Sequence, residues 1–345
     1  MVKQWGNWKN IEPIGEGGAG RVYKVKNVET GKIAALKVFK NPKRYHRSFN
    51  EVEAIKKLAH PGIIPLLDYN LKADKSFAVY EYEAGGSLAS LTPSELFSIP
   101  LYQRLNLCEQ VCDALQAIHD AGLIHRDVKP DNLLISEDRK TIRLCDFGLV
   151  SALGYERQTA TMEQVGSRYY IPPELEDGRA GELSHTSDIY SMGKVLYYVI
   201  TGRIFARERH RDREYDLAII LDNPYLESIS RILDHSITDD LQKRKEISSA
   251  RKMKSLIQWA SQHITEELPL PNAWETYRCI FCRQGTYKMV ASSSDLELVE
   301  QEGYTEGAKP RKGMVFLECE NCGNCQRFKL FTRGKQWFPG AFNTD

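Results

Sequence analysis

The 345-residue sequence has almost no net charge and no long apolar run, and both absences exclude classes of protein. The formal net charge is +1, so no overall field attracts the protein to nucleic acid or to an anionic membrane. No stretch reaches the ~18 uninterrupted apolar residues of a membrane span, and the first residues lack the apolar core of a signal peptide. We therefore expect a cytoplasmic protein with no membrane partner.

Cysteine is scarce over most of the chain and concentrated near its end. Only Cys108, Cys112 and Cys145 precede residue 266, and the first two lie on an apolar stripe where we interpret them as core residues. The asymmetry indicates a second module, and a length of 345 residues also favours two domains. Without a secretion signal, Cys-x-x-Cys spacing indicates metal binding rather than disulfides.

Two acidic loops carry the clearest chemical signal. One loop contains Asp127, Lys129 and Asn132, and Asp146 follows fourteen residues after Asn132. Phosphoryl transfer requires one carboxylate to orient the attacking hydroxyl and hard oxygen ligands to hold magnesium. Two carboxylates, an ammonium group and a carboxamide are therefore suited to a metal-bound polyphosphate.

These loops resemble those of the protein kinase family, because His125-Arg126-Asp127-x-Lys129-x-x-Asn132 and Asp146-Phe147-Gly148 match its catalytic and metal-binding motifs. The resemblance implies ATP and Mg²⁺ (or Mn²⁺) as cofactors. It implies that Asp127 accepts the substrate hydroxyl's proton, that Lys129 neutralises the γ-phosphate, and that Asn132 and Asp146 bind the metal. Lys129, two residues after Asp127, resembles the lysine that kinases of the serine/threonine class carry at this position.

The motif Gly15-x-Gly17-x-x-Gly20 is followed by alternating apolar residues and a turn, which predicts a β-hairpin rather than the strand-to-helix turn of a dinucleotide-binding fold. Glycines there would let the backbone close over phosphates. The kinase resemblance implies that Tyr80 is the gatekeeper and that the backbone of Glu81 and Glu83 binds adenine. The full set of nucleotide-site residues implied is Ile14, Gly15, Gly17, Gly20, Val22, Ala35, Lys37, Tyr80, Glu81, Glu83, Leu134 and Asp146.

The resemblance also implies an ion pair between a strand lysine, Lys37, and a helix glutamate. Apolar residues from Phe49 onward recur with helical spacing, and their phase predicts that Glu51 lies off the core face. Glu51 matches the family's position, nine residues before His60, and Glu53 is the alternative. Lys37 would also bind the α- and β-phosphates of ATP.

Residues 146–174 resemble a kinase activation segment, and loops of this length inside a domain are usually functional. We expect phosphorylation of Thr159 or Thr161 to order it through Arg126, and Ser167 to position substrate. Two further contacts are expected on the same resemblance. Glu174 would pair with Arg244, and Asp188 would cap the backbone of the catalytic loop.

The C-terminal module has two cysteine pairs separated by 36 residues, and four thiolates form the usual structural zinc site. We favour Cys279, Cys282, Cys319 and Cys322 as ligands, with Cys325 as the alternative. Strands are predicted at 287–290 and 314–317, so the module resembles a zinc ribbon. Residues 266–345, the linker and the module together, carry ten Lys and Arg against eleven Asp and Glu, a net charge of about −1 that disfavours nucleic acid as the ligand. A protein partner is the interpretation we favour.

The predicted fold class is α+β: a two-lobed kinase-like domain at 8–265, with lobes at 8–83 and 84–265, a linker at 266–273, and a zinc-ribbon-like β domain at 274–345. The predicted activity is transfer of the γ-phosphoryl group of ATP to serine or threonine of protein substrates, with autophosphorylation. The alternatives are a catalytically weak pseudokinase that binds partners through the zinc module, and a small-molecule phosphotransferase.

Overall fold

The structure, a computed structural model, describes residues 4–17, 20–39, 45–72, 76–152, 168–220, 226–265, 287–292, 314–319, 325–333 and 336–341. The chain divides into two compact units. One comprises residues 1–210 together with 231–261, and the other comprises residues 211–230 together with 262–345.

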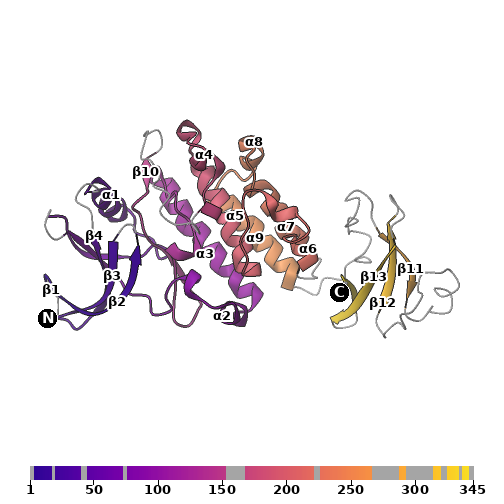
Figure 1. The fold of residues 1–345 in the computed structure, drawn as a ribbon, viewed down its shortest axis with the longest axis horizontal. Helices are drawn as coiled ribbons and strands as arrows, with labels where there is room; N and C mark the ends of the chain where they lie inside the picture. The colour runs from indigo at the N-terminus through magenta and orange to yellow at the C-terminus, as the bar shows by residue number, and fades with distance from the viewer. Residues whose placement is uncertain are drawn as a thin grey trace. The chain divides into compact units, whose positions relative to one another are not determined.

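A six-stranded antiparallel sheet forms the N-terminal part of the first unit (Figure 1). The glycine motif lies where β2 and β3 pair, and β3 pairs antiparallel with β4 across the turn that follows it, which confirms the predicted hairpin. In spatial order the strands are β1 (Gln4–Trp5), β2 (Trp8–Gly17), β3 (Gly20–Asn27), β4 (Ile33–Phe39), β6 (Phe77–Glu81) and β5 (Leu66–Asn70).

Two tryptophans fasten the first strands to this sheet. Trp5 and Trp8 are both 5% exposed and belong to a core cluster with Leu36, Phe77 and other apolar residues of the sheet. The ring of Trp5 meets that of Phe77 edge-on at 5.9 Å, and Trp8 Nε1 donates a hydrogen bond to Asp68 Oδ2 at 2.8 Å. The burial of both rings, together with the hydrogen bond of the Trp8 indole N–H, holds β1 and β2 against the rest of the sheet.

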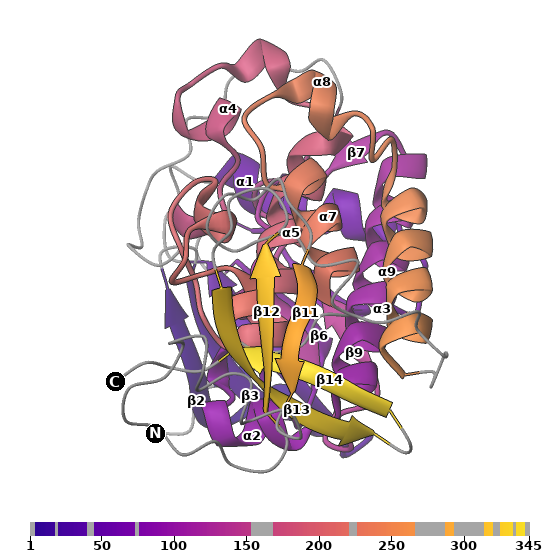
Figure 2. The ribbon, with the colours of Figure 1, turned by 90° about the vertical axis from the view of Figure 1, so that its right-hand side faces the viewer.

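Most of the described α-helices lie between residues 93 and 265, and one, α1 (Tyr45–Lys56), precedes them. α3, α5 and α9 run alongside one another (Figures 1 and 2). The ion pair of Lys254 on α9 with Asp113 on α3, at 2.7 Å, joins two of them. The bounds are α2 (Pro93–Ser98), α3 (Leu101–Asp120), α4 (Pro173–Glu176), α5 (His185–Thr201), α6 (Leu217–Ile220), α7 (Glu227–Ser236), α8 (Leu241–Arg244) and α9 (Ala250–Thr265).

Local signals set the ends of the central helix α5. Ser184 and Ser187 form a reciprocal capping box at its start, and Gly202, with φ 65°, ends it in the left-handed conformation. Nearly every side chain of α5 is buried, as its apolar sequence predicts. Among the described residues, no helix is long and apolar enough to cross a membrane.

Two small antiparallel sheets frame the loop that carries Asp127. β7 (Leu123–Ile124) precedes the loop and pairs with β10 (Ser151–Ala152). β8 (Leu133–Ile135) follows the loop and pairs with β9 (Ile142–Leu144). The loop is therefore held by hydrogen-bonded strands on both sides.

The second unit contains a four-stranded antiparallel sheet in which consecutive strands pair. The strands predicted at 287–290 and 314–317 are confirmed as parts of the first two strands. The last two were not predicted. The bounds are β11 (Tyr287–Ser292), β12 (Met314–Cys319), β13 (Cys325–Arg333) and β14 (Gln336–Ala341).

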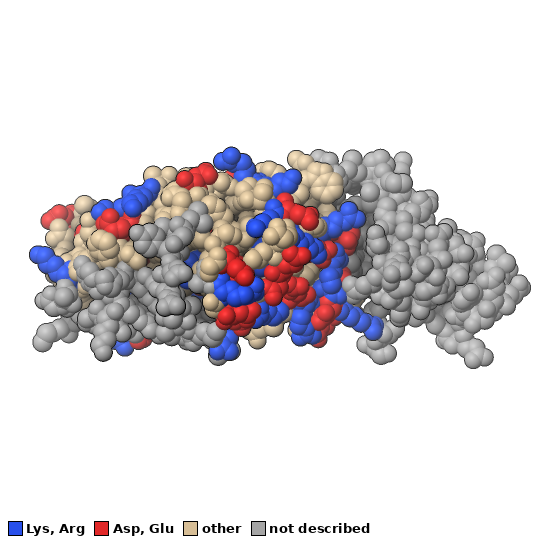
Figure 3. Space-filling view, turned by 90° about the horizontal axis from the view of Figure 1, so that it is seen from above, with Lys and Arg blue, Asp and Glu red and all other residues tan. Residues whose placement is uncertain are grey.

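Charged side chains of both signs are intermixed on the face of the described residues seen in Figure 3. Lys and Arg lie next to Asp and Glu there rather than gathering in a field of one sign. This mixture agrees with a formal net charge of +1.

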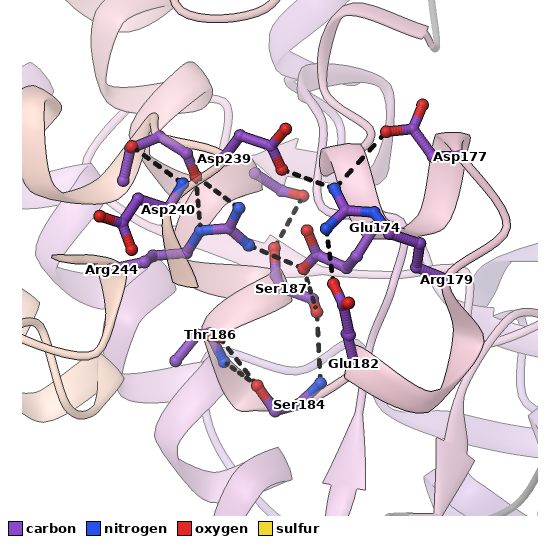
Figure 4. Close-up of polar contacts among 12 residues, drawn as sticks. Glu174, Asp177, Arg179, Glu182, Ser184, Thr186, Ser187, Asp239, Asp240 and Arg244 are labelled. Atoms are coloured by element: carbon purple, nitrogen blue, oxygen red, sulfur yellow. Dashed lines mark hydrogen bonds and ion pairs between the residues drawn. The ribbon is translucent and has the colours of Figure 1, made fainter. Parts of the chain in front are cut away.

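A buried ion pair crosses the helical region (Figure 4). Arg244 Nη1 lies 2.7 Å from Glu174 Oε1, and both side chains are 0% exposed, which confirms the predicted pair. Ser187 Oγ donates to the same carboxylate at 2.7 Å, and Arg244 Nε donates to the Thr238 carbonyl at 3.0 Å. A buried carboxylate is tolerated here because a charged donor and a neutral donor both contact its Oε1.

Replacing Arg244 by methionine should destabilise the protein by about 3–5 kcal/mol, because Glu174 would stay buried without its cation. Arg179 provides a matched control, since it pairs with Asp239 and Glu182 in the same region but its side chain is 34% exposed. Arg179→Met should cause a much smaller loss. Urea unfolding of both variants measures this, and equal losses would contradict the expectation.

Candidate active site

The loop that carries Asp127 is anchored by one buried carboxylate of α5. Asp188 accepts a hydrogen bond from the His125 backbone N–H at 2.9 Å and one from the Arg126 N–H at 2.8 Å. Arg126 has φ 69°, a left-handed conformation that is unfavourable for a residue with a side chain. The two bonds to Asp188 stabilise this turn, as the sequence predicts.

His119 completes the anchor. Its Nε2 lies 2.8 Å from Asp188 Oδ2, so this histidine supports the loop from α3. Burial alone would raise the pKa of Asp188, but the hydrogen bond and charge of His119, with His125 and the backbone donors, outweigh burial and lower it. Asp188 is therefore held as a carboxylate, the form that accepts both N–H groups.

Asp127, Lys129 and Asn132 form one cluster in this loop. Lys129 Nζ lies 2.9 Å from Asp127 Oδ2. Asn132 Nδ2 donates to the same oxygen at 2.8 Å and to the Asp127 carbonyl at 2.7 Å. Proline at the start of the short helix Pro130–Asn132 turns the chain so that Asn132 returns to the aspartate. The Asp127 carboxylate is thus oriented by two donors on the same oxygen.

Lys37 joins three elements at one ammonium group. Its Nζ lies 2.9 Å from each Glu51 carboxylate oxygen and 3.0 Å from Asp146 Oδ1. Lys37 comes from β4, Glu51 from α1, and Asp146 from the loop after β9, where it has φ 60°. The predicted choice of Glu51 over Glu53 is confirmed, because Glu53 instead contacts Lys56 at 2.8 Å.

The prediction that Glu51 lies off the core face is wrong. Glu51 is 2% exposed, whereas Phe49, placed on the core face by periodicity, is 43% exposed. Val52 and Ile55 are buried as predicted. The carboxylate of Glu51 on α1 points inward because it pairs with the buried Lys37. The spacing of apolar residues cannot predict such a buried ionic contact.

Burial and charge act against each other in this group. Burial alone would lower the pKa of Lys37, but the carboxylates of Asp146 and Glu51 outweigh it and raise the pKa. Burial raises the pKa of Glu51, while Lys37 and a hydrogen bond from the Tyr80 hydroxyl oppose that rise. The pKa of Asp146 is lowered, because Lys37 and the Gly148 N–H overcome its burial.

The loop that carries Asp146 and the loop that carries Asp127 are joined by hydrogen bonds. The Cys145 N–H donates to the Asn132 carbonyl at 2.9 Å, and His125 Nε2 lies 3.3 Å from the Cys145 carbonyl. The rings of His125 and Phe147 meet edge-on at 5.0 Å. Asp146 and Asn132 therefore belong to one hydrogen-bonded unit. Burial raises the pKa of the Cys145 thiol, which argues against a reactive thiolate there.

The predicted nucleotide-site residues follow the register of the N-terminal sheet. Val22 pairs opposite Lys37, and Ala35 opposite Tyr80. A Cβ on Gly20 would lie 2.3 Å from the Val38 carbonyl oxygen, so only glycine fits there. Leu134 forms a bridge with Ser87. Of the other predicted residues, Ile14, Gly15 and Gly17 lie in β2, Glu81 ends β6, and Glu83 follows two residues later.

The segment after β6 carries an ionic contact that the sequence does not predict. Arg143 Nη1 lies 2.7 Å from Glu81 Oε2 and 2.7 Å from Glu83 Oε1. The Glu81 N–H already donates to the Pro65 carbonyl at 3.0 Å, so a ligand at Glu81 would have to use its carbonyl. Arg143 stands on β9 opposite Leu134, and alternation along that short strand is its only sequence signal.

The predicted regulatory residues Thr159, Thr161 and Ser167 lie outside the described residues, as do Cys279, Cys282 and Cys322. Among the residues that are described, no group of three or more His, Cys, Asp or Glu could hold a metal ion. The Asp146 carboxylate and the Asn132 carboxamide nevertheless suit Mg²⁺, which is usually bound by one or two carboxylates together with substrate phosphates.

A glycine-bearing hairpin, a lysine–glutamate pair and two linked acidic loops define a protein kinase fold. Residues 8–266 match the family model of the protein kinase domain, and the chain belongs to that family. It is similar to a probable serine/threonine-protein kinase of Clostridium perfringens, with 32% identity over 197 residues, or 56% of this chain and 28% of that protein.

Two further relatives agree. The serine/threonine-protein kinase PrkC of Bacillus subtilis is 32% identical over 206 residues, covering 58% of this chain and 31% of PrkC. The DNA damage-responsive serine/threonine-protein kinase RqkA of Deinococcus radiodurans is 33% identical over 203 residues, covering 57% of this chain and 30% of RqkA. The matched part of the chain thus spans less than a third of each of these relatives.

Asp188→Asn should destabilise the protein by about 1.5–3 kcal/mol at neutral pH, because an amide cannot replace a carboxylate that accepts two backbone bonds. The folded pKa of Asp188 is lowered, so its stabilisation is present above the unfolded value of ~3.9 and lost as pH falls through the folded value. The difference between wild type and variant should therefore shrink below about pH 4.

Denaturant unfolding at several pH values measures this difference. Asp113→Asn, which removes a 42%-exposed carboxylate paired with Lys254, serves as the control and should show a small, nearly constant difference. A gap for Asp188→Asn that stays constant down to pH 2 would contradict the assigned role.

Proposed function

We propose that this protein transfers the γ-phosphoryl group of ATP to serine or threonine residues of protein substrates. The observation that carries the proposal is the joining of the two acidic loops: the Cys145 N–H bonds to the Asn132 carbonyl, beside an Asp146 that contacts Lys37. Asp127, Asn132, Asp146 and Lys37 are then available to one substrate.

Each residue has a role that follows from its contacts. Asp127, held by Lys129 and Asn132, would orient the substrate hydroxyl and accept its proton. Bound ATP would supply the phosphoryl group, and its Mg²⁺ would neutralise the charge that develops on the phosphate oxygens. Asp146 and Asn132 would hold the metal, and Lys37, kept charged by its carboxylates, would bind the phosphates.

The serine/threonine assignment is supported by Lys129, two residues after Asp127, and by the printed names of the relatives. The pseudokinase alternative is disfavoured, because Lys37, Glu51, Asp127, Asn132 and Asp146 are all present. A small-molecule phosphotransferase is disfavoured by Lys129 and by the Pro173-Glu174 segment that contacts Arg244.

Regulation of this site would involve the segment after Asp146. We infer that phosphorylation of Thr159 or Thr161 would provide an anion for Arg126 and thereby order the segment. Ser167 would contribute a hydroxyl near the substrate. A cytoplasmic location and the domain bounds 8–265 and 274–345 remain predictions.

Asp127→Asn should lower transfer of labelled phosphate from ATP to a generic basic protein by at least ~100-fold, because an amide is a poor proton acceptor. Asp120→Asn is the matched control, since Asp120 is an exposed aspartate at the end of α3, and it should retain wild-type transfer. Labelling of metabolites but not of protein would instead support the small-molecule alternative. Full transfer by Asp127→Asn would refute the assigned role.

For the C-terminal unit we propose a zinc ribbon that binds a protein partner. Cys319 ends β12 and Cys325 begins β13, and Tyr287, five residues after Cys282 in the sequence, pairs opposite Cys319. This register favours gathering the cysteine pairs at one end of the sheet. Four thiolates would hold the ion tetrahedrally and stabilise a module with a small core.

Metal analysis of the purified protein should find about one zinc per chain. Cys319→Ser should remove it, whereas Cys325→Ser should leave it if Cys279, Cys282, Cys319 and Cys322 are the ligands. Chelation should unfold the C-terminal unit, because metal binding and folding of small zinc modules are coupled. Well under one zinc per chain, with full folding retained in chelator, would contradict the proposal.

A further inference from the structure

Tyr80, at the end of β6, makes a contact for which the nucleotide-site assignment gives no reason. Its hydroxyl donates a hydrogen bond to Glu51 Oε1 at 2.7 Å. Both side chains are buried, Tyr80 at 9% and Glu51 at 2% exposure. The bond therefore links the strand directly to α1, without passing through Lys37.

The charges around Glu51 explain why such a bond matters. Two carboxylates, Glu51 and Asp146, share the single ammonium group of Lys37 at 2.9–3.0 Å. When Lys37 interacts with a phosphate, its interaction with Glu51 becomes weaker. The Tyr80 hydroxyl is a neutral donor on a fixed strand, so its bond to Glu51 is independent of how Lys37 divides its contacts.

We propose that Tyr80 is a positioning residue whose hydroxyl holds Glu51, and with it α1, in the place where Glu51 orients Lys37. The part of this role that concerns Lys37 and ATP rests on the proposed kinase function. The docking of α1 does not, because it is a property of the protein without nucleotide. Tyr80 would act through Glu51 and need not touch the reacting atoms.

Hydrogen exchange of the α1 amides tests the docking in the protein without nucleotide. Tyr80→Phe keeps the ring and removes only the hydroxyl, so the sheet should fold normally while α1 exchanges about tenfold faster, as expected for losing a hydrogen bond to a charged acceptor. Tyr69→Phe is the matched control, because Tyr69 lies on the neighbouring strand, 42% exposed, over Lys56 of α1. It should leave α1 exchange unchanged.

A double-mutant cycle separates positioning from a general packing effect. In a Glu51→Gln background the hydroxyl has lost its charged acceptor, so adding Tyr80→Phe should change α1 exchange by less than about twofold. Calorimetry with Mg²⁺–ATP should show about tenfold weaker binding for Tyr80→Phe alone, with little further loss when it is added to Glu51→Gln.

The outcomes are distinct. Wild-type α1 exchange in Tyr80→Phe, or an equal effect of that substitution with and without Glu51→Gln, would overturn the proposal. Failure of the wild type to bind Mg²⁺–ATP would overturn the proposed function, and the exchange measurements would still decide the role of Tyr80.

Discussion

The ammonium group of Lys37 is the point on which the arrangement of the site depends. Three segments far apart in sequence, β4, α1 and the loop after β9, meet there through contacts of 2.9–3.0 Å. Because one buried cation serves two carboxylates, neither Glu51 nor Asp146 can be moved without changing the other's environment. The position of α1 is thereby coupled to the position of the Asp146 carboxylate.

A second buried carboxylate fixes the other half of the site. Asp188 holds the left-handed turn at Arg126 through two backbone N–H groups, and His119 holds Asp188. Glu174 and Arg244 form a comparable buried ion pair in the helical region. In each of these places a buried charge accepts hydrogen bonds from more than one donor, and these bonds fix its geometry.

The sequence predicts much of this arrangement because the relevant residues stand in short motifs. The sequence alone identifies the loops of Asp127 and Asp146, the glycine hairpin, and the pairs Lys37–Glu51 and Glu174–Arg244. The apolar periodicity also predicted correctly that Cys108 and Cys112 are buried on the inner face of α3. It failed for α1, where Phe49 is exposed and Glu51 buried, since hydrophobic spacing does not detect a helix that faces a buried cation.

Contacts between residues without a motif were not predictable in this way. Nothing local in the sequence indicates that the Tyr80 hydroxyl reaches Glu51, or that Arg143 contacts Glu81 and Glu83. These contacts depend on the register of strands that pair across long separations in the chain. The strands β13 and β14 were not predicted either, and β14 contains Pro339 and Gly340, two residue types that are depleted in strands.

The central claim is that Lys37, Asp146, Asn132 and Asp127 form a single magnesium–nucleotide site. Calorimetric titration with a non-hydrolysable ATP analogue tests it most directly, with and without Mg²⁺, on the wild type and on Lys37→Met. The account predicts one nucleotide per chain, binding that depends on Mg²⁺, and at least ~10-fold weaker affinity for Lys37→Met, because a charge-assisted contact to phosphate is lost. Binding that ignores both the metal and the substitution would contradict it.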